Sequence, residues 1–168
     1  MAELSLTEHA VLGVLAEGPT HGFAIARELG AESDLGRIFT VRRPLVYRAL
    51  DRLVEAGVAE TVHVEPSDAG PNRVVHRVTR SGRRHLLRWL DEPVEHVRDL
   101  RLELMLKLAL LARSGRSAGG LVSRQREALS PTLAALETAG SEDPVEMWRR
   151  HIARAADAYL AELADLVG

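Results

Sequence analysis

Cysteine is absent from the chain of 168 residues, so the protein has no disulfide, no cysteine-ligated zinc site and no cysteine nucleophile. Long apolar runs are absent too: charged residues interrupt the most apolar stretch, residues 100–112, which is well short of the roughly 20 residues of a membrane span. The N-terminal segment lacks a basic flank and carries Glu3 and Glu8, which argues against a secretory signal. From these absences we expect a soluble, cytoplasmic protein with no membrane association.

Motifs typical of enzymes and metal sites are also missing. The seven histidines show neither the His-x-x-x-His nor the His-Glu-x-x-His spacing of a zinc site. The chain has no glycine-rich phosphate loop, no Gly-x-Ser-x-Gly elbow and no pair of carboxylates in a catalytic pattern. We therefore predict no catalytic residues, no metal and no cofactor, and do not expect an enzyme.

Positive charge is unevenly distributed along the chain. The net charge of the whole chain is −2, which by itself does not indicate nucleic-acid binding. Residues 37–52, however, hold five arginines and one acidic residue, residues 73–88 hold six arginines and no acidic residue, and residues 91–168 hold ten basic and thirteen acidic residues. The planar guanidinium of arginine suits phosphates and guanine edges. The two arginine-rich segments are therefore either a nucleic-acid surface or ordinary solvated faces.

The first half of the chain combines short helices with a hairpin. Its composition, 46% apolar and 27% charged over the whole chain, supports one sizeable domain or two small ones. Apolar spacing predicts three helices, over residues 7–17, 21–29 and 43–56. The period then changes from about 3.6 to about 2 in two valine-rich segments, 58–64 and 73–79, joined by a turn over 65–72. This is the order of a winged helix-turn-helix, whose third helix enters the major groove of DNA.

The rest of the chain shows only helical patterns. A further helix is expected over residues 81–90. Residues 100–111 are apolar almost all round, which predicts a helix buried on most sides. The helix over 121–136 should be kinked or split at Pro131. The last helix, 145–166, has apolar residues three or four positions apart, as a packed pair of helices needs.

These patterns define the predicted fold class, which is mainly α with a small β component (α+β). A winged helix-turn-helix with a two-stranded wing occupies residues 1–92, and an all-helical dimerisation and effector domain occupies residues 93–168, with Pro93 at the boundary. Glu103 and Lys107, four residues apart on the buried helix, are expected to form a structural ion pair.

The motifs of the N-terminal half, taken in order, resemble those of PadR-type transcriptional regulators. The run from Leu12 to Leu29, in which Gly-Pro-Thr-His-Gly-Phe precedes the second helix, is similar to the start of these proteins. Residues 45–57 resemble the family's recognition helix, and residues 76–82 resemble the segment that closes the wing. The leucine-rich residues 100–111 and the last helix with Trp148 fit the longer C-terminal domain of one branch. The resemblance implies a homodimeric DNA-binding regulator, usually a repressor, which a small ligand releases in some members.

The sequence departs from the family pattern at several positions. Phe23 stands where a tyrosine often contacts a phosphate, so that hydroxyl contact is lost, and His76 replaces a tyrosine of the wing. Arg42, Arg43 and Leu45 replace the small polar residues that usually enter the recognition helix. We expect these differences to change the operator sequence that is read, whereas the binding mode stays as the resemblance implies.

The candidate DNA-binding residues lie at the starts of the second and third helices and at the tip of the wing. Arg42, Arg43 and Arg48 are expected to reach base edges or phosphates, and Arg52 to reach the backbone at best. The whole set is His21, Phe23, Thr40, Arg42, Arg43, Pro44, Leu45, Tyr47, Arg48, Arg52, Asn72 and Arg73.

Other members of this set have two interpretations each. Leu45 either contacts a thymine methyl or packs in the core. The ring of Tyr47 is expected to pack, which leaves its hydroxyl for a phosphate. Asn72 and Arg73 at the wing tip are candidates for the DNA backbone or the minor groove.

The C-terminal helices carry more apolar surface than they can hide among themselves, which predicts a symmetric homodimer. The tryptophans, Trp89 and Trp148, either stack on a flat ligand or lie in the core or the dimer interface. The candidate dimerisation residues are Leu104, Leu108, Leu111, Trp148, Ile152, Tyr159, Leu163 and Leu166.

Two other classes of function remain open from the sequence. One is a protein-interaction adaptor that keeps the winged-helix fold without binding DNA, consistent with the acidic C-terminal half. The other is a ligand sensor with a pocket between the C-terminal helices. His63 and His76, on opposite strands of the hairpin, either form a metal site or pH switch or are ordinary packing residues.

Overall fold

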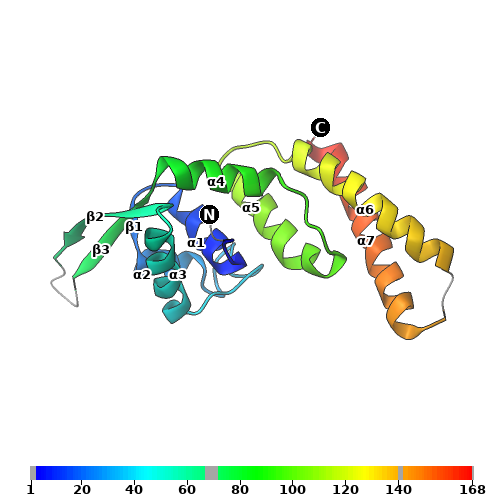
Figure 1. Cartoon of the computed structure of the whole chain (residues 1–168), viewed down its shortest axis with the longest axis horizontal. Helices are drawn as coiled ribbons and strands as arrows, with labels where there is room; N and C mark the ends of the chain where they lie inside the picture. The colour runs from blue at the N-terminus through cyan, green and yellow to red at the C-terminus, as the bar shows by residue number, and fades with distance from the viewer. Residues whose placement is uncertain (1–2, 67–71, 140–141, 168) are drawn as a thin grey trace. The chain divides into compact units, whose positions relative to one another are not determined.

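The computed structural model describes residues 3–66, 72–139 and 142–167. The chain divides into two compact units, Met1–Trp89 and Leu90–Gly168 (Figure 1). Helix α4 (Arg80–Asp91) runs through this boundary, which lies three residues before the predicted one. In the described ranges, none of the helices has the length and apolarity to cross a membrane.

Three helices begin the N-terminal unit, as predicted: α1 (Leu6–Leu15), α2 (Gly22–Glu28) and α3 (Arg43–Glu55). Ser5 caps α1 in a capping box, in which its backbone N–H donates to the Glu8 carboxylate at 2.6 Å and its hydroxyl accepts from the Glu8 N–H at 3.3 Å. Pro44 stands in the first turn of α3, where its missing N–H costs nothing. Gly57, with φ +68, ends that helix in the left-handed conformation that glycine adopts readily.

A three-stranded antiparallel sheet accompanies these helices. The predicted hairpin consists of β2 (Ala59–Glu65) and β3 (Arg73–Val78), and most of the predicted turn between them lies outside the described residues. A third strand, β1 (Thr20–His21), pairs with the other side of β3, so the order is β1-β3-β2. Strand β1 was not predicted from the sequence because two residues are too few to show an alternating pattern.

The core of the N-terminal unit lies where α1 and α2 pack against α3. One side of α3 is buried, with Val46 and Leu53 fully inaccessible to solvent. Leu35 is also fully buried, which shows that the segment between α2 and α3 folds back onto this core. Because one side of α3 is occupied in this way, its arginines emerge on the other side.

A stack of rings joins α1 to α4 within this unit. His9 is buried, and its ring lies 4.2 Å from that of Trp89 with an interplanar angle of 12°. The His9 Nε2 is 3.1 Å from the Nε2 of His85. Trp89 is itself buried, so it serves the core, in agreement with one of the two interpretations that the sequence left open.

Helices are the only regular secondary structure among the described residues of the C-terminal unit. It begins with a short 3₁₀ turn, η1 (Val97–Asp99), and a π-helical segment, η2 (Leu100–Leu104), which leads into α5 (Met105–Arg113). Two long helices follow, α6 (Gly119–Ala139) and α7 (Pro144–Val167), which pack side by side (Figure 1). Helix α6 continues through Pro131, so it is not split there.

Buried polar groups hold the start of this unit in place. Lys107 has 1% of its side chain exposed and pairs with Glu103 at 2.7 Å, which confirms the predicted ion pair. Its ammonium also donates to the Glu92 carbonyl at 2.8 Å. The buried amide of Gln125 accepts from the Val94 N–H at 2.6 Å and donates to the Val94 carbonyl at 3.0 Å. These bonds tie the segment after α4 to α5 and α6.

His76 is the buried titratable group of the sheet. It lies on the central strand β3, and no hydrogen-bond partner for its Nδ1 is found among the described residues. Burial lowers the pKa of His76 below its usual value of 6.5, against the Asp51 carboxylate, which acts to raise it. Folding therefore favours the neutral ring.

We expect the free energy of unfolding to decrease as the pH falls through about 6.5, because the unfolded chain takes up a proton that folded His76 resists. Well above that pH the ring is neutral in both states and contributes no pH dependence. Urea titrations from about pH 7.5 to about pH 5.5 measure the slope, which His76→Gln should reduce. Equal slopes in the two proteins would contradict this role of His76.

Candidate nucleic-acid interface

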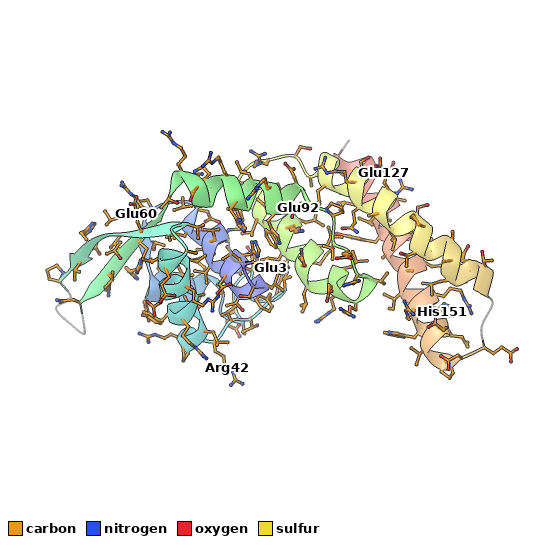
Figure 2. All side chains as sticks on the ribbon, viewed as in Figure 1. Glu3, Arg42, Glu60, Glu92, Glu127 and His151 are labelled. Carbon is orange, nitrogen blue, oxygen red and sulfur yellow. The ribbon has the colours of Figure 1, made fainter. Side chains whose placement is uncertain are left out.

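The exposed side of α3 carries most of the predicted DNA-binding residues. Arg42 is the residue before the first turn of α3, and it points away from the unit into solvent (Figure 2). Arg43, Leu45 and Arg48 are also exposed. Leu45 has 40% of its surface exposed, so it does not belong to the core of the N-terminal unit.

The arginines of this unit fall into two groups according to their partners. Arg77 pairs with Glu60 at 2.7 Å, and Arg83 donates to the Ala16 carbonyl at 3.3 Å. By contrast, Arg42, Arg43 and Arg48 have no ion pair with a carboxylate in the described parts of the chain. These three exposed guanidinium groups lie at the start and on the exposed side of α3.

Arg52 has a structural partner that the sequence did not reveal. Its Nε lies 2.8 Å from the Glu8 carboxylate, whose side chain is only 7% exposed. The same carboxylate closes the capping box of α1, so this ion pair links α3 to the start of α1. Arg52 keeps 61% of its side chain exposed, and the DNA contact predicted for it stays a prediction.

Two exposed aromatic rings flank Arg43. The guanidinium carbon of Arg43 lies 5.0 Å from the centroid of Phe23, on α2, and 5.7 Å from that of Tyr47, on α3. Both distances are in the range of a cation–π interaction. Phe23 is 47% exposed and Tyr47 is 41% exposed, so neither ring is a core residue.

Gly22 makes room for this arrangement. A Cβ atom at Gly22 would stand 2.8 Å from the Cε1 of Tyr47, closer than any ordinary van der Waals contact. In the sequence this glycine appears only as part of the Gly-Pro-Thr-His-Gly-Phe motif. Its spatial role depends on a residue 25 positions later, which no local pattern shows.

The other predicted residues lie before α2, before α3 and at the start of β3. The Nδ1 of His21 accepts from the Ala24 N–H at 3.2 Å and so caps α2. The hydroxyl of Thr40 donates to the Gly36 carbonyl at 2.7 Å, which orders the segment before α3. Asn72 and Arg73 are exposed at the start of β3.

The two histidines of the hairpin have different environments. His63 is exposed and lies 3.1 Å from Glu65, whereas His76 is buried. His63 on β2 pairs with Val75 on β3, and Val75 is the neighbour of His76 in the sequence. The pairing of β2 with β3 is irregular between Thr61 and His63. Across the described ranges, no cluster of three or more side chains is suited to hold a metal ion.

The predicted dimerisation residues divide by burial within the C-terminal unit. Leu104 and Leu111 are buried inside the protomer. Leu108, Ile152 and Leu163 are half-buried. The exposed members of the set lie on α7 and are Trp148 at 66%, Tyr159 at 41% and Leu166 at 80%.

Comparison with known proteins finds a family model that matches part of the chain. Residues 11–88 match the family described as "Transcriptional regulator PadR-like family". No curated protein matches the chain. Among solved structures, Bacillus subtilis PadR in complex with operator DNA is similar with a TM-score of 0.49 and 20% identity, covering 98% of this chain and 100% of that one.

Two further structures are similar over most of both chains. Bacillus subtilis PadR in complex with p-coumaric acid has a TM-score of 0.46 and 21% identity, covering 97% of this chain and 99% of that one. A PadR-like transcriptional regulator from Bacillus cereus has a TM-score of 0.42 and 15% identity, covering 96% and 93%.

Alanine at Gly22 and alanine at Gly82 should have different effects on stability, because the first displaces only a side chain and the second meets fixed backbone. Gly22→Ala is expected to move the Tyr47 ring and to cost less than about 1 kcal/mol of stability, because the end of a side chain yields easily. Gly82→Ala should cost about 2–3 kcal/mol or more, since its Cβ would overlap the Val58 carbonyl oxygen, which is fixed backbone. Thermal denaturation and the NMR signals of the Tyr47 ring measure the two effects. Equal losses of stability would contradict the packing described for Gly22.

Proposed function

We propose that the protein, whose residues 11–88 match the PadR-like family of transcriptional regulators, is a sequence-specific repressor that binds operator DNA as a homodimer. The recognition element is α3, which enters the major groove, while the hairpin of β2 and β3 lies along the neighbouring backbone.

The observation that carries this proposal is the group of arginines without carboxylate partners at α3. A solvated surface that served only solubility would mix positive and negative charge, as Arg77 and Glu60 do on the sheet. Arg42, Arg43 and Arg48 are instead all exposed at the start and along α3, without a carboxylate partner among the described residues. Such a surface suits phosphates and the guanine edges of the major groove.

The homodimer is supported by the exposed apolar residues of α7. Trp148, Tyr159 and Leu166 lie on a helix whose other side packs against α6, and a second copy of the chain would bury them. A two-fold axis places two copies of α3 about 34 Å apart, or a multiple of that distance. The operator is then a pseudo-palindrome.

Release of DNA by a small ligand is part of the same proposal. The C-terminal unit has a groove of about 410 Å³, lined by apolar residues that include Leu108, Tyr159 and Leu163. This volume is in the range of small-molecule sites. A ligand acts as an effector only if its affinity differs between the DNA-bound and DNA-free forms. Adding candidate ligands to a DNA titration tests this part separately.

The proposed function is tested by fluorescence anisotropy on the promoter DNA of the protein's own gene and on scrambled DNA, across a series of salt concentrations. We expect preferential binding to the promoter, with the logarithm of affinity falling linearly against the logarithm of salt concentration. Equal, weak binding to both DNAs would argue against this promoter as the operator. No binding even at low salt would refute the proposal and favour the protein-interaction adaptor.

Two arginine variants should behave differently in that titration. Arg48→Ala is expected to cost about 1–3 kcal/mol on the operator and to relax the sequence preference, because Arg48 faces base edges. Arg73→Ala should weaken binding to both DNAs alike and reduce the salt slope by about 1, as the loss of one phosphate contact does. If neither variant changes operator affinity, α3 and the wing are not the DNA-binding surface.

Trp148→Ser should weaken the homodimer by about 2 kcal/mol, roughly 30-fold in Kd, because a large exposed ring at an interface contributes most when it is fully desolvated. Glu162→Ser, an exposed polar position on the same helix, is the matched control. Sedimentation equilibrium measures both. An unchanged dimer in Trp148→Ser would remove α7 from the interface.

A further inference from the structure

The arginines of α3 that lack carboxylate partners are not equivalent. Arg43 alone among them stacks against aromatic rings, at 5.0 Å from Phe23 and 5.7 Å from Tyr47 in the described structure. Phe23 belongs to α2 and Tyr47 to α3, so the guanidinium is held between two helices. Two of the few aromatic side chains of the protein are thus exposed to solvent around a single cation.

Stacking uses the faces of a guanidinium and leaves its edge for ligands. The N–H donors of arginine lie in the plane of the group, in a fork that matches two phosphate oxygens. Two rings at cation–π distance restrict the side chain before any ligand arrives, so less freedom is lost on binding. No carboxylate among the described residues competes for the edge of Arg43.

The position of the stack distinguishes a phosphate from a base. In a helix-turn-helix the third helix of this unit reads the groove, and the preceding helix crosses the DNA backbone. The contact with Phe23 draws Arg43 towards α2, on the backbone side, whereas Arg48 lies further along α3 without such a contact. Arg43 is therefore placed at the edge of the groove.

We propose that Arg43 is a clamp for one backbone phosphate of the DNA, held in its binding geometry by Phe23 and Tyr47 as positioning residues. This inference rests on the proposed function and specifies how one part of its surface works. Gly22 belongs to the same device, because a side chain there would displace the Tyr47 ring.

The geometry is tested first in the free protein, by NMR of arginine side chains. Ring currents should shift the Nε–H signal of Arg43 away from those of exposed arginines such as Arg37. Phe23→Leu should reduce the shift and Phe23→Trp should preserve it. A signal of Arg43 that Phe23→Leu leaves unchanged would overturn the stack.

The function of the stack is tested by a double-mutant cycle on promoter and scrambled DNA across a salt series. Arg43→Ala should weaken binding to both DNAs by the same factor, about tenfold, and reduce the salt slope by about 1. Phe23→Leu should weaken both by about threefold with the slope unchanged, and it should have no further effect in the Arg43→Ala background. Phe23→Trp should restore the affinity, since it keeps an aromatic face.

Two controls distinguish loss of the clamp from loss of folding and from loss of one positive charge. Thermal denaturation verifies that Phe23→Leu remains folded, as its 47% exposure leads us to expect. Arg37→Ala removes the same charge from an exposed position, and its effect should add to that of Phe23→Leu rather than replace it.

The outcomes of the double-mutant cycle test separately the positioning role of Phe23 and the phosphate contact of Arg43. Additive effects of Arg43→Ala and Phe23→Leu would overturn the positioning role. A greater loss on promoter DNA than on scrambled DNA in Arg43→Ala would make Arg43 a base-reading residue and overturn the phosphate clamp. If the wild-type protein binds neither DNA, the proposed function fails and the clamp fails with it.

Discussion

The burial of one side of α3 is the constraint on which the rest of the N-terminal unit depends. Val46, Leu50 and Leu53 fill the space between α1 and α2 and are almost inaccessible to solvent. Since a helix has a fixed period, this burial determines which residues face outwards, and the unpaired arginines are among them. A substitution that loosened the core would therefore also change the direction of the candidate DNA-binding side chains, even though it touches none of them.

The arginines of this unit share a residue type but have different physical roles. Arg52 lies towards the end of α3 and reaches back to Glu8, which is buried and would carry an uncompensated charge without it. Arg43 lies at the start of the same helix and is held by rings, which restrict it without neutralising its charge. A carboxylate partner uses the donors of an arginine, whereas an aromatic partner leaves them available. The kind of partner thus separates a structural arginine from one that remains able to bind an anion.

Sequence patterns predicted the elements whose formation depends on neighbouring residues. Periodicity and glycine signals were enough for α1, α2, α3 and the hairpin, because amphipathic spacing and helix ends are properties of neighbouring residues. They missed β1, which exists only because β3 lies beside it, and they did not settle whether α6 continues through Pro131. The contacts of Arg43 with Phe23 and of Arg52 with Glu8 join residues 20 and 44 positions apart. Only the tertiary structure brings such pairs together, so no spacing rule could have shown them.

Helix α7 illustrates how one sequence pattern can serve two surfaces. Its apolar residues, three or four positions apart, predicted a packed helix pair, but the residues of α7 that are fully buried within the protomer are Ala153 and Leu160, seven positions apart. Trp148, Tyr159 and Leu166, which belong to the predicted dimerisation residues, remain exposed. Successive residues of a helix are rotated by about 100°, which places the exposed stripe roughly 100–140° around the helix from the buried residues. The apolar face of α7 is therefore wider than one partner helix covers. The uncovered part carries the large rings, which have the most to gain from burial against a second copy of the chain.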